Sequence, residues 1–263
     1  MPSRRLASPA EQAPTSIDLS RPSPARIYDY VLGGAHNFAV DRAVAHLMAE
    51  RMPNLAESMR ANRRFLRRAV RFLVDAGIRQ FLDLGSGIPT VGNVHEIAQG
   101  AAPWSRVVYV DADPVAVEHS RVILRGVDRT AILQADVRDP EHILAEAATQ
   151  GGIDFDQPVA VIAAAVLHFV PDDDDPDAIV ARLCGPLASG SYLALSHVTC
   201  DGVDHVPEPG VHPRPRTAIE AFFDGLTLVD PGVVVVPDWR PEPLGEPGDP
   251  ALVAVYGGVG RKD

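Results

Sequence analysis

Residues 79–87 read RQFLDLGSG, a stretch that predicts a short buried strand ending in a glycine turn. The apolar run of Phe81, Leu82 and Leu84 is short and is bounded by Gly85, as is typical of strands in parallel sheets. A glycine at such a turn permits positive φ and lets a ligand approach the backbone closely. The stretch therefore predicts the first strand of an α/β sheet, with a ligand site beyond its carboxyl end.

Predicted strands and helices alternate along the chain after this turn. Strands separated by helices of roughly 10–15 residues indicate a parallel sheet with helices on both faces. The expected strands are residues 79–85, 105–113, 130–136, 158–166 and 190–198, and the expected helices are 90–102, 114–124, 140–150 and 177–187.

The C-terminal part of the chain breaks this alternation. Residues 216–239 predict a helix and then a strand that extends into the VVVV run at 233–236, and residues 251–258 predict another strand after a Pro/Gly-rich loop. Two strands joined without a helix should be antiparallel. We therefore expect a Rossmann-like α/β fold whose seven-stranded, mostly parallel sheet ends in an antiparallel hairpin.

The N-terminal part of the chain differs in composition from the sheet region. Residues 1–24 are rich in Pro, Ser and charge and predict a disordered arm. Residues 25–77 predict an N-terminal helical cap, and residues 78–263 the Rossmann-like domain.

A repeat of arginines at helical spacing predicts that one face of the cap's long helix is solvated, with binding of an acidic acceptor as the alternative. The repeat consists of Arg60, Arg63, Arg64, Arg67, Arg68 and Arg71.

Composition limits the partners of this 263-residue chain. Its formal net charge of -11 does not favour nucleic acid or an anionic membrane. No apolar run approaches the ~18 residues needed to span a bilayer, and no secretory signal opens the chain. The two cysteines lack metal-site spacing, and the consecutive acids of DDDDPD cannot converge on one ion. We expect a cytoplasmic protein without a metal site.

Acidic residues end three successive predicted strands. Asp83 precedes the glycine turn, Asp111 follows Gly87 at close to the ~20 residues expected of a carboxylate that binds ribose hydroxyls, and Asp136 ends the third strand. This order predicts a site for an adenosine-bearing cofactor, with Asp136 on the adenine amino group and Val137 on its ring. The candidate cofactor-binding residues are Asp83, Gly85, Ser86, Gly87, Asp111, Ala112, Asp113, Asp136 and Val137.

The glycine pattern distinguishes between two such cofactors. A dinucleotide fingerprint is GxGxxG, but Thr90 occupies the third glycine position here. Pro89 lacks the N–H that would help to bind a pyrophosphate at a helix start. The pattern favours S-adenosylmethionine over NAD.

The chain also resembles a large bacterial family of class I S-adenosylmethionine-dependent methyltransferases with mostly unassigned substrates. The resemblance is carried by SPARIYDYVLGGAHNFAVDR, ANRRFLRRAVRFL, QFLDLGSGIPTVGNVHEIAQ, RVVYVDADPVAV, LQADVRDP, VAVIAAAVLHFVPDDDDP, GSYLALSHVT and the ending FFDGLTLVDPGVVVVPDWRPE…YGGVGRK. It implies the class I fold and S-adenosylmethionine as cofactor. One departure is segment 201–212, which is short and proline-rich here and in the family is longer and partly helical.

The acceptor side of the site is predicted less directly. His168 follows the fourth strand and is the candidate base or orienting group, with His197 after the fifth strand as a weaker candidate. Tyr28, Tyr30, Asn37 and Phe38 are candidates for the substrate pocket, in a segment that would form a lid over the cofactor; the alternative is a helix with a glycine C-cap that packs on the sheet. We expect a methyltransferase acting on a small molecule; the alternatives are a non-catalytic S-adenosylmethionine-binding sensor or scaffold and a disfavoured NAD-dependent oxidoreductase.

Overall fold

The computed structural model of the chain describes residues 21–52, 54–88, 92–202, 210–242 and 253–263. Three sequence-based predictions fall outside these ranges: the arm over residues 1–20, the roles of Pro89 and Thr90, and residues 203–209 of the short segment. Among the described helices, none combines the length and the apolar character needed to cross a bilayer.

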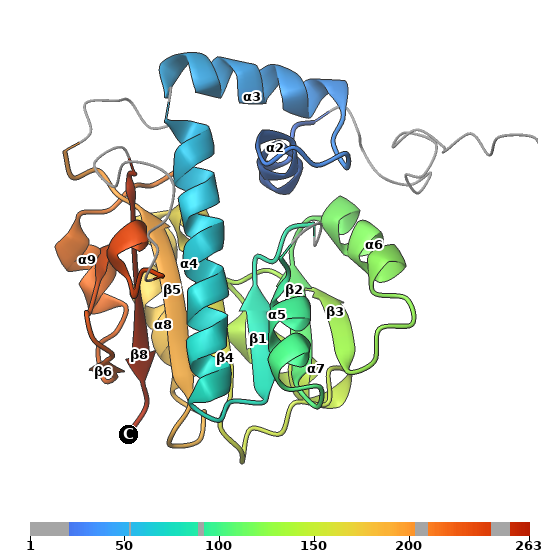
Figure 1. Cartoon of the computed structure of the whole chain (residues 1–263), viewed down its shortest axis with the longest axis vertical. Helices are drawn as coiled ribbons and strands as arrows, with labels where there is room; N and C mark the ends of the chain where they lie inside the picture. Colours follow the sequence, from blue (N-terminus) through green and yellow to red (C-terminus); the bar gives the residue numbers. More distant parts are fainter. Residues whose placement is uncertain (1–20, 53, 89–91, 203–209, 243–252) are drawn as a thin grey trace, which may run out of the picture.

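One sheet of eight strands organises the described residues, in the order β3-β2-β1-β4-β5-β8-β6, with β7 also paired to β8 (Figure 1). The first five strands of this order run parallel, and β8 is antiparallel to β5, β6 and β7. This confirms the α/β fold. The strands are β1 Gln80–Leu84, β2 Arg106–Asp111, β3 Thr130–Gln134, β4 Ala160–Ala164, β5 Tyr192–Val198, β6 Thr227–Leu228, β7 Val234–Val235 and β8 Val255–Arg261.

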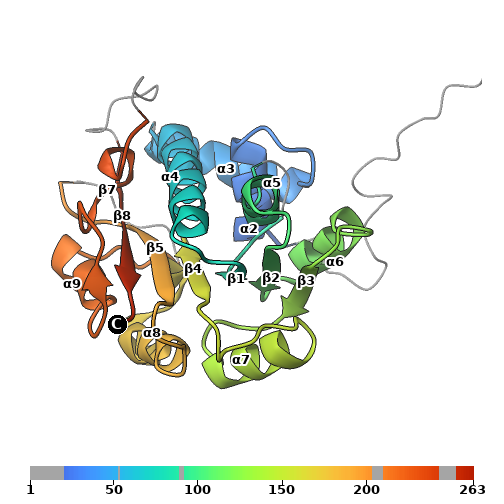
Figure 2. The ribbon, with the colours of Figure 1, turned by 60° about the horizontal axis from the view of Figure 1, so that its bottom comes forward.

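Helices cover both faces of the sheet, as Figure 2 shows for α4 and α5 on one side and α7 and α8 on the other. Alternate strand residues explain this arrangement, since Phe81 packs into the core beneath α4 and α5 while Leu82 packs into the core beneath α7 and α8. The helices are α2 Pro24–Val31, α3 Ala39–Arg51, α4 Leu55–Asp75, α5 Val94–Ala101, α6 Pro114–Ile123, α7 Pro140–Thr149, α8 Pro176–Cys184 and α9 Arg216–Ala221.

The C-terminal hairpin contains one more strand than predicted. The single strand expected to run into residues 233–236 is divided into β6 and β7, which pair with different parts of β8. Pro231 lies between them and has no N–H to donate to a ladder, so pairing is interrupted there.

The arginine-rich face of α4 is less solvated than predicted. Arg68 is buried and donates to the carbonyl oxygens of Trp239 at 2.8 Å and Val236 at 2.5 Å. Its charge therefore satisfies backbone acceptors of the segment after β7. The sequence repeat alone cannot distinguish such a buried arginine from its exposed neighbours Arg60 and Arg71.

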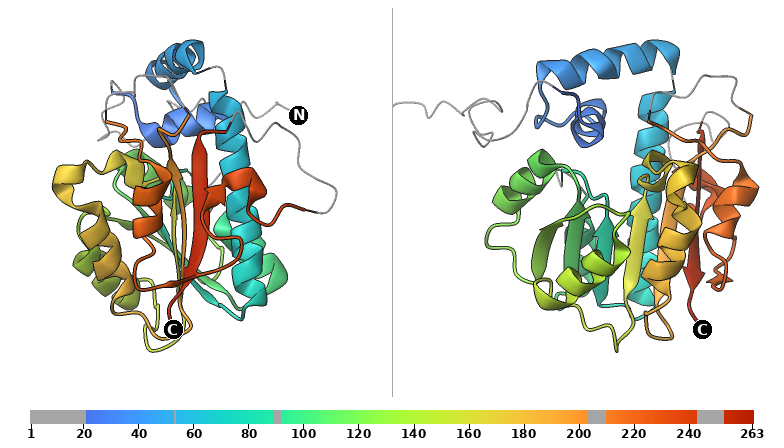
Figure 3. Two further views of the ribbon diagram at one scale, coloured as in Figure 1. Left: turned by 90° about the vertical axis from the view of Figure 1, so that its left-hand side faces the viewer. Right: turned by 180° about the vertical axis from the view of Figure 1, so that it is seen from behind.

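Helices α2 and α3 lie beyond the carboxyl ends of the parallel strands (Figures 1 and 3). A buried ion pair holds them together, because Arg26 Nε donates to Asp41 Oδ2 at 2.8 Å. Asp41 also accepts from the backbone N–H groups of Ser23 and Phe38, at 3.0 and 2.8 Å. The α2–α3 pair is thus positioned over the sheet edge where the candidate residues lie.

Candidate functional site

The turn after β1 has the conformation that its glycines permit. Gly85 and Gly87 adopt φ values of 61° and 63°, in the left-handed region. A Cβ at Gly85 would lie 2.3 Å from Cγ2 of Val166, two residues after the end of β4. A Cβ at Gly87 would have only the Ala25 side chain of α2 within 4 Å, at 3.8 Å. The backbone at Gly87 is therefore open on the side that faces the α2–α3 pair.

Asp111 at the end of β2 is tied to this turn. Its Oδ2 accepts from the N–H of Gly87 at 2.7 Å, and its Oδ1 accepts from the N–H of Asp113 at 2.8 Å. Burial raises the pKa of Asp111, and these backbone bonds oppose the rise. A carboxylate has about four acceptor positions, so two remain for a ligand beside the turn.

Asp113 has a different local role. Its Oδ1 caps α6 by accepting from Val115 N–H at 2.8 Å, and its Oδ2 accepts from the hydroxyl of Ser23. Ala112 between the two aspartates is exposed. The structure thus separates Asp111, which faces the glycine turn, from Asp113, which joins α6 to the start of α2.

Asp83 lies beneath the turn with no hydrogen bond to any described residue. Its side chain is buried, and burial raises its pKa to about 7, with the charge of Arg63 lowering it and the charge of Asp111 raising it. Near neutral pH a cation beside Asp83 would favour the ionised form. Ser86 in the same turn has a buried hydroxyl oxygen without a partner.

The residues after β3 are arranged differently. Asp136 is paired with Arg138, whose Nη2 lies 2.5 Å from Oδ2, and Arg138 also reaches Asp174 at 3.2 Å. This pairing lowers the pKa of Asp136. Val137 packs against the core below the sheet edge.

The four predicted lid residues divide into two groups. Tyr28 faces α4, with its hydroxyl 3.1 Å from the carbonyl oxygen of Met59. The other three serve the packing of α2 and α3 themselves. The Tyr30 hydroxyl lies 3.1 Å from His46 Nε2, Asn37 donates to Asp29 at 3.0 Å, and the Phe38 ring packs under Arg26.

The side chain of Asn37 is fully engaged within this segment. Besides Asp29, its amide donates to the Gly34 carbonyl oxygen at 2.9 Å, and its Oδ1 accepts from Arg42 at 3.0 Å. Both the donor and the acceptor that the sequence suggested for a ligand are therefore used to hold the loop between α2 and α3.

His168 and His197 lie together beyond β4 and in β5, with ring centroids 5.6 Å apart. Burial lowers the pKa of His168 well below its usual value and that of His197 to about 4, so both rings are neutral at neutral pH. Neither ring nitrogen of His168 has a hydrogen-bond partner among the described residues, and its Nδ1 is buried. Phe169 beside it is partly exposed.

Arg214 completes this cluster, although its place in the sequence does not predict this. It donates to His197 Nε2 at 2.9 Å, to the carbonyl oxygens of Leu167 and Val170, and to Asp172 Oδ1 at 2.6 Å. Its partners are distant in sequence, so no local pattern predicts this role for Arg214. Arg63, whose charge lowers the pKa of Asp83, belongs to the arginine repeat of α4, and the repeat does not distinguish it from the other arginines.

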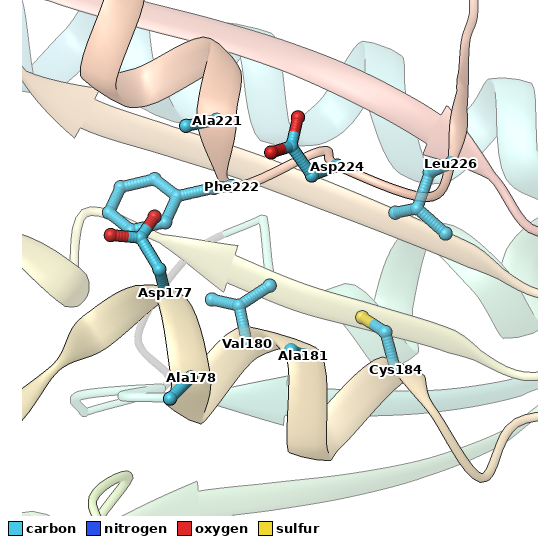
Figure 4. Close-up of a pocket in the computed structure, with 9 residues that line it drawn as sticks. All are labelled: Asp177, Ala178, Val180, Ala181, Cys184, Ala221, Phe222, Asp224 and Leu226. Atoms are coloured by element: carbon cyan, nitrogen blue, oxygen red, sulfur yellow. The ribbon is translucent and has the colours of Figure 1, made fainter.

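A cavity of ≈ 340 Å³ lies elsewhere, between α8 and the segment around α9 (Figure 4). It is lined by Asp177, Ala178, Val180, Ala181, Cys184, Ala221, Phe222, Asp224 and Leu226. None of these residues belongs to the turn after β1 or to the ends of β2 and β3. Within the described ranges, no group of three or more His, Cys, Asp or Glu side chains is arranged to hold a metal ion.

Comparison with known proteins gives this arrangement a context. The family model described as S-adenosyl methyltransferase matches residues 10–263. A candidate methyltransferase from Thermobifida fusca has a similar structure, with 41% sequence identity, a TM-score of 0.86, and coverage of 95% of this chain and 98% of that chain. A DUF574 family protein from Streptomyces avermitilis is 42% identical, with a TM-score of 0.88 and coverage of 94% and 99%.

A more distant structure shares the fold. The 1,6-didemethyltoxoflavin-N1-methyltransferase of Burkholderia thailandensis, solved with 1,6-didemethyltoxoflavin and S-adenosylhomocysteine, has a TM-score of 0.50 and 16% identity, and the match covers 86% of this chain and 91% of that one. At this identity the likeness concerns the arrangement of strands and helices.

Proposed function

Because the chain belongs to the S-adenosyl methyltransferase family, we propose that it transfers the methyl group of S-adenosylmethionine to a small-molecule acceptor in the bacterial cytoplasm. The observation that carries this proposal is the turn of Gly85 and Gly87, flanked by the buried carboxylates of Asp83 and Asp111. Support for the acceptor class comes from the distant relative that binds 1,6-didemethyltoxoflavin.

The residues at the sheet edge fit the cofactor. Asp83 would accept from the ammonium of the methionine moiety, and the unpartnered hydroxyl of Ser86 and the open backbone at Gly87 would contact the same ligand. Asp111 would hold the ribose hydroxyls, with Ala112 beside it. Asp136 and Val137 would bind adenine, with Arg138 keeping Asp136 ionised. Asp113 would keep α6 in position.

The acceptor would lie between the His168 cluster and α2. Bound S-adenosylmethionine supplies an electrophilic methyl group, so the protein contributes mainly alignment and exclusion of water. His168 would orient the acceptor through its buried, unpartnered Nδ1, because burial lowers the pKa of its ring and disfavours the protonated form, and His197 packs against it. Tyr28 would join the lid to α4 through Met59, whereas Tyr30, Asn37 and Phe38 would keep the lid in shape.

The same proposal gives residues 25–77 a role as a cap over the cofactor site and places the protein in the cytoplasm. Residues 25–77 would form the cap, in which α2 and α3 cover the sheet edge while α4 packs on the sheet. The two free cysteines suit the reducing cytoplasm.

Asp111→Ala is expected to weaken binding of S-adenosylhomocysteine by roughly 1.5–3 kcal/mol, the range for a hydrogen bond to a charged group. Asp113→Ala is the matched control: it removes the α6 cap and should cost about 1 kcal/mol of stability with little change in affinity. Calorimetric titration of both variants measures the difference. A larger loss of affinity for Asp113→Ala would move the ribose site to that residue.

A further inference from the structure

Arg214 is a buried cation that lies between β5 and α9, beside the histidines of the acceptor side. Its backbone is fixed against the end of β5, because its N–H donates to the carbonyl oxygen of Val198 at 3.2 Å and it forms a bridge with Thr199. The side chain therefore starts from a fixed point and reaches the turn after β4.

Every N–H donor of the Arg214 guanidinium has an acceptor. Nη1 donates to His197 Nε2 at 2.9 Å and to the Leu167 carbonyl oxygen at 3.1 Å. Nη2 donates to the Val170 carbonyl oxygen at 2.8 Å and to Asp172 Oδ1 at 2.6 Å, and Nε donates to the same carboxylate oxygen at 3.1 Å. Asp172 balances the charge, and the remaining donors hold uncharged groups in place.

These bonds determine which nitrogen of His197 carries the proton. A guanidinium has no acceptor, so Nε2 of His197 must accept from Arg214. The proton of the neutral ring is therefore on Nδ1, which donates to the carbonyl oxygen of Val198 at 2.7 Å. Both nitrogens are then occupied, and a second proton on this ring would have to displace Arg214.

The turn that carries His168 is held by the same side chain. Leu167 and Val170, whose carbonyl oxygens accept from Arg214, precede and follow His168 in this turn. The carbonyl oxygen of His168 accepts from the N–H of His212, two residues before Arg214, at 2.7 Å. Loss of the Arg214 side chain would thus free the turn at both of its ends.

The ring of His168 is oriented by neighbouring rings. Its centroid lies 4.3 Å from that of Phe169 and 5.6 Å from that of His197, which meets it edge to face. Its Nδ1 is buried without a partner among the described residues. Val166, two residues earlier in the chain, packs against Gly85 of the glycine turn, so the turn that carries this ring adjoins the cofactor site.

We infer that Arg214 is a positioning residue of the acceptor side: it holds His197 as the Nδ1–H tautomer and fixes the turn after β4, so that the ring of His168 meets the methyl acceptor in one orientation. The inference rests on the proposed function and adds to it a residue that acts through His197 and His168. Such alignment is what methyl transfer to an acceptor requires of the protein.

The charges around the two rings give the direction of the test. Burial is the main cause that lowers the pKa of both, to about 4 for His197 and well below the usual value for His168. The charge of Arg214 lowers both further. His197 and His212 also lower the pKa of His168, and Asp172 raises that of His197. Removing the Arg214 charge should therefore raise the pKa of each ring.

Side-chain NMR of isotope-labelled protein tests the inference. In the native protein, His197 should be the neutral Nδ1–H tautomer from about pH 5 to 8. In Arg214→Gln, its pKa should rise from about 4 towards the ordinary value of about 6.5, so that the ring gains a proton within this range. The amide of His212 should also exchange about 10-fold faster, because the turn is no longer held. Arg214→Lys keeps the charge without the fork, so His197 should stay neutral while the His212 amide still loses protection.

Arg216→Gln is the matched control, because the Arg216 side chain is 48% exposed, pairs with Glu220 at the surface and carries the same charge. This variant should leave the His197 ring and the His212 amide unchanged. An Nε2–H tautomer in the native protein, or an unchanged His197 in folded Arg214→Gln, would overturn the inference.

Addition of S-adenosylhomocysteine to the same native sample separates the inference from the proposed function. Bound ligand should shift the ring signals of His168, because the turn that carries this ring adjoins the cofactor site. Binding without a shift at His168 would overturn the inference while the proposed function stands. Failure of the native protein to bind S-adenosylhomocysteine would instead refute the proposed function.

Discussion

Replacing Gly87 with valine is expected to abolish measurable binding of S-adenosylhomocysteine, a loss of more than about 100-fold, in a protein that still folds. The backbone at Gly87 has a φ of 63°, which a β-branched residue adopts only with strain of order 1–3 kcal/mol. The new side chain would also occupy the open side of the turn, since only Ala25 lies within 4 Å of its Cβ. Calorimetry measures the affinity and circular dichroism the fold.

Gly126→Val supplies the control for backbone strain. Gly126 has a φ of 81° with no atom within 4 Å of a Cβ, and it lies after α6, away from the turn. The Gly126→Val variant should lose stability but keep its affinity for S-adenosylhomocysteine. Gly85→Val is less informative, because its side chain would collide with Val166 inside the protein. Undiminished affinity in folded Gly87→Val would remove the glycine turn from the cofactor site.

Asp41→Asn is expected to lower the free energy of unfolding by about 3–5 kcal/mol, because it leaves the buried charge of Arg26 without its counter-charge. The Arg26 and Asp41 side chains are 2% and 0% exposed, so water cannot replace the lost interaction. Urea unfolding measures the stability, and hydrogen exchange over residues 25–40 should show loss of protection there first.

The surface pair of Arg121 and Glu118 on α6 serves as the comparison, since both of its side chains are at least 36% exposed. Glu118→Gln should cost less than about 1 kcal/mol. If Asp41→Asn costs no more than Glu118→Gln, the ion pair does not hold the α2–α3 pair over the sheet.

Binding of the cofactor should slow hydrogen exchange of residues 25–40 in the native protein, where they cover the site.

The features predictable from sequence are those with a local physical signal. The glycine turn, the buried strand before it and the carboxylate that ends β2 each follow from a few adjacent residues, and the structure brings Gly87 and Asp111 into direct contact. Alternation of strands and helices was likewise enough to predict a parallel sheet with both faces covered.

The features that escaped prediction depend on contacts between distant segments. Arg214 acquires its role from Asp172 and His197, and Arg68 from the segment after β7. The amide of Asn37 is available in the sequence but is used by Asp29 and Arg42 in the fold. Helical periodicity places residues on a face and says nothing of what packs against that face, which is why the arginines of α4 could not be distinguished.

The most direct test of the central claim is calorimetric titration of the purified native protein with S-adenosylmethionine, S-adenosylhomocysteine and NAD. A glycine turn between Asp83 and Asp111, in a member of the S-adenosyl methyltransferase family, predicts one site per chain for each of the first two ligands and no saturable binding of NAD. Binding of NAD in preference to S-adenosylhomocysteine, or binding of neither, would contradict the account.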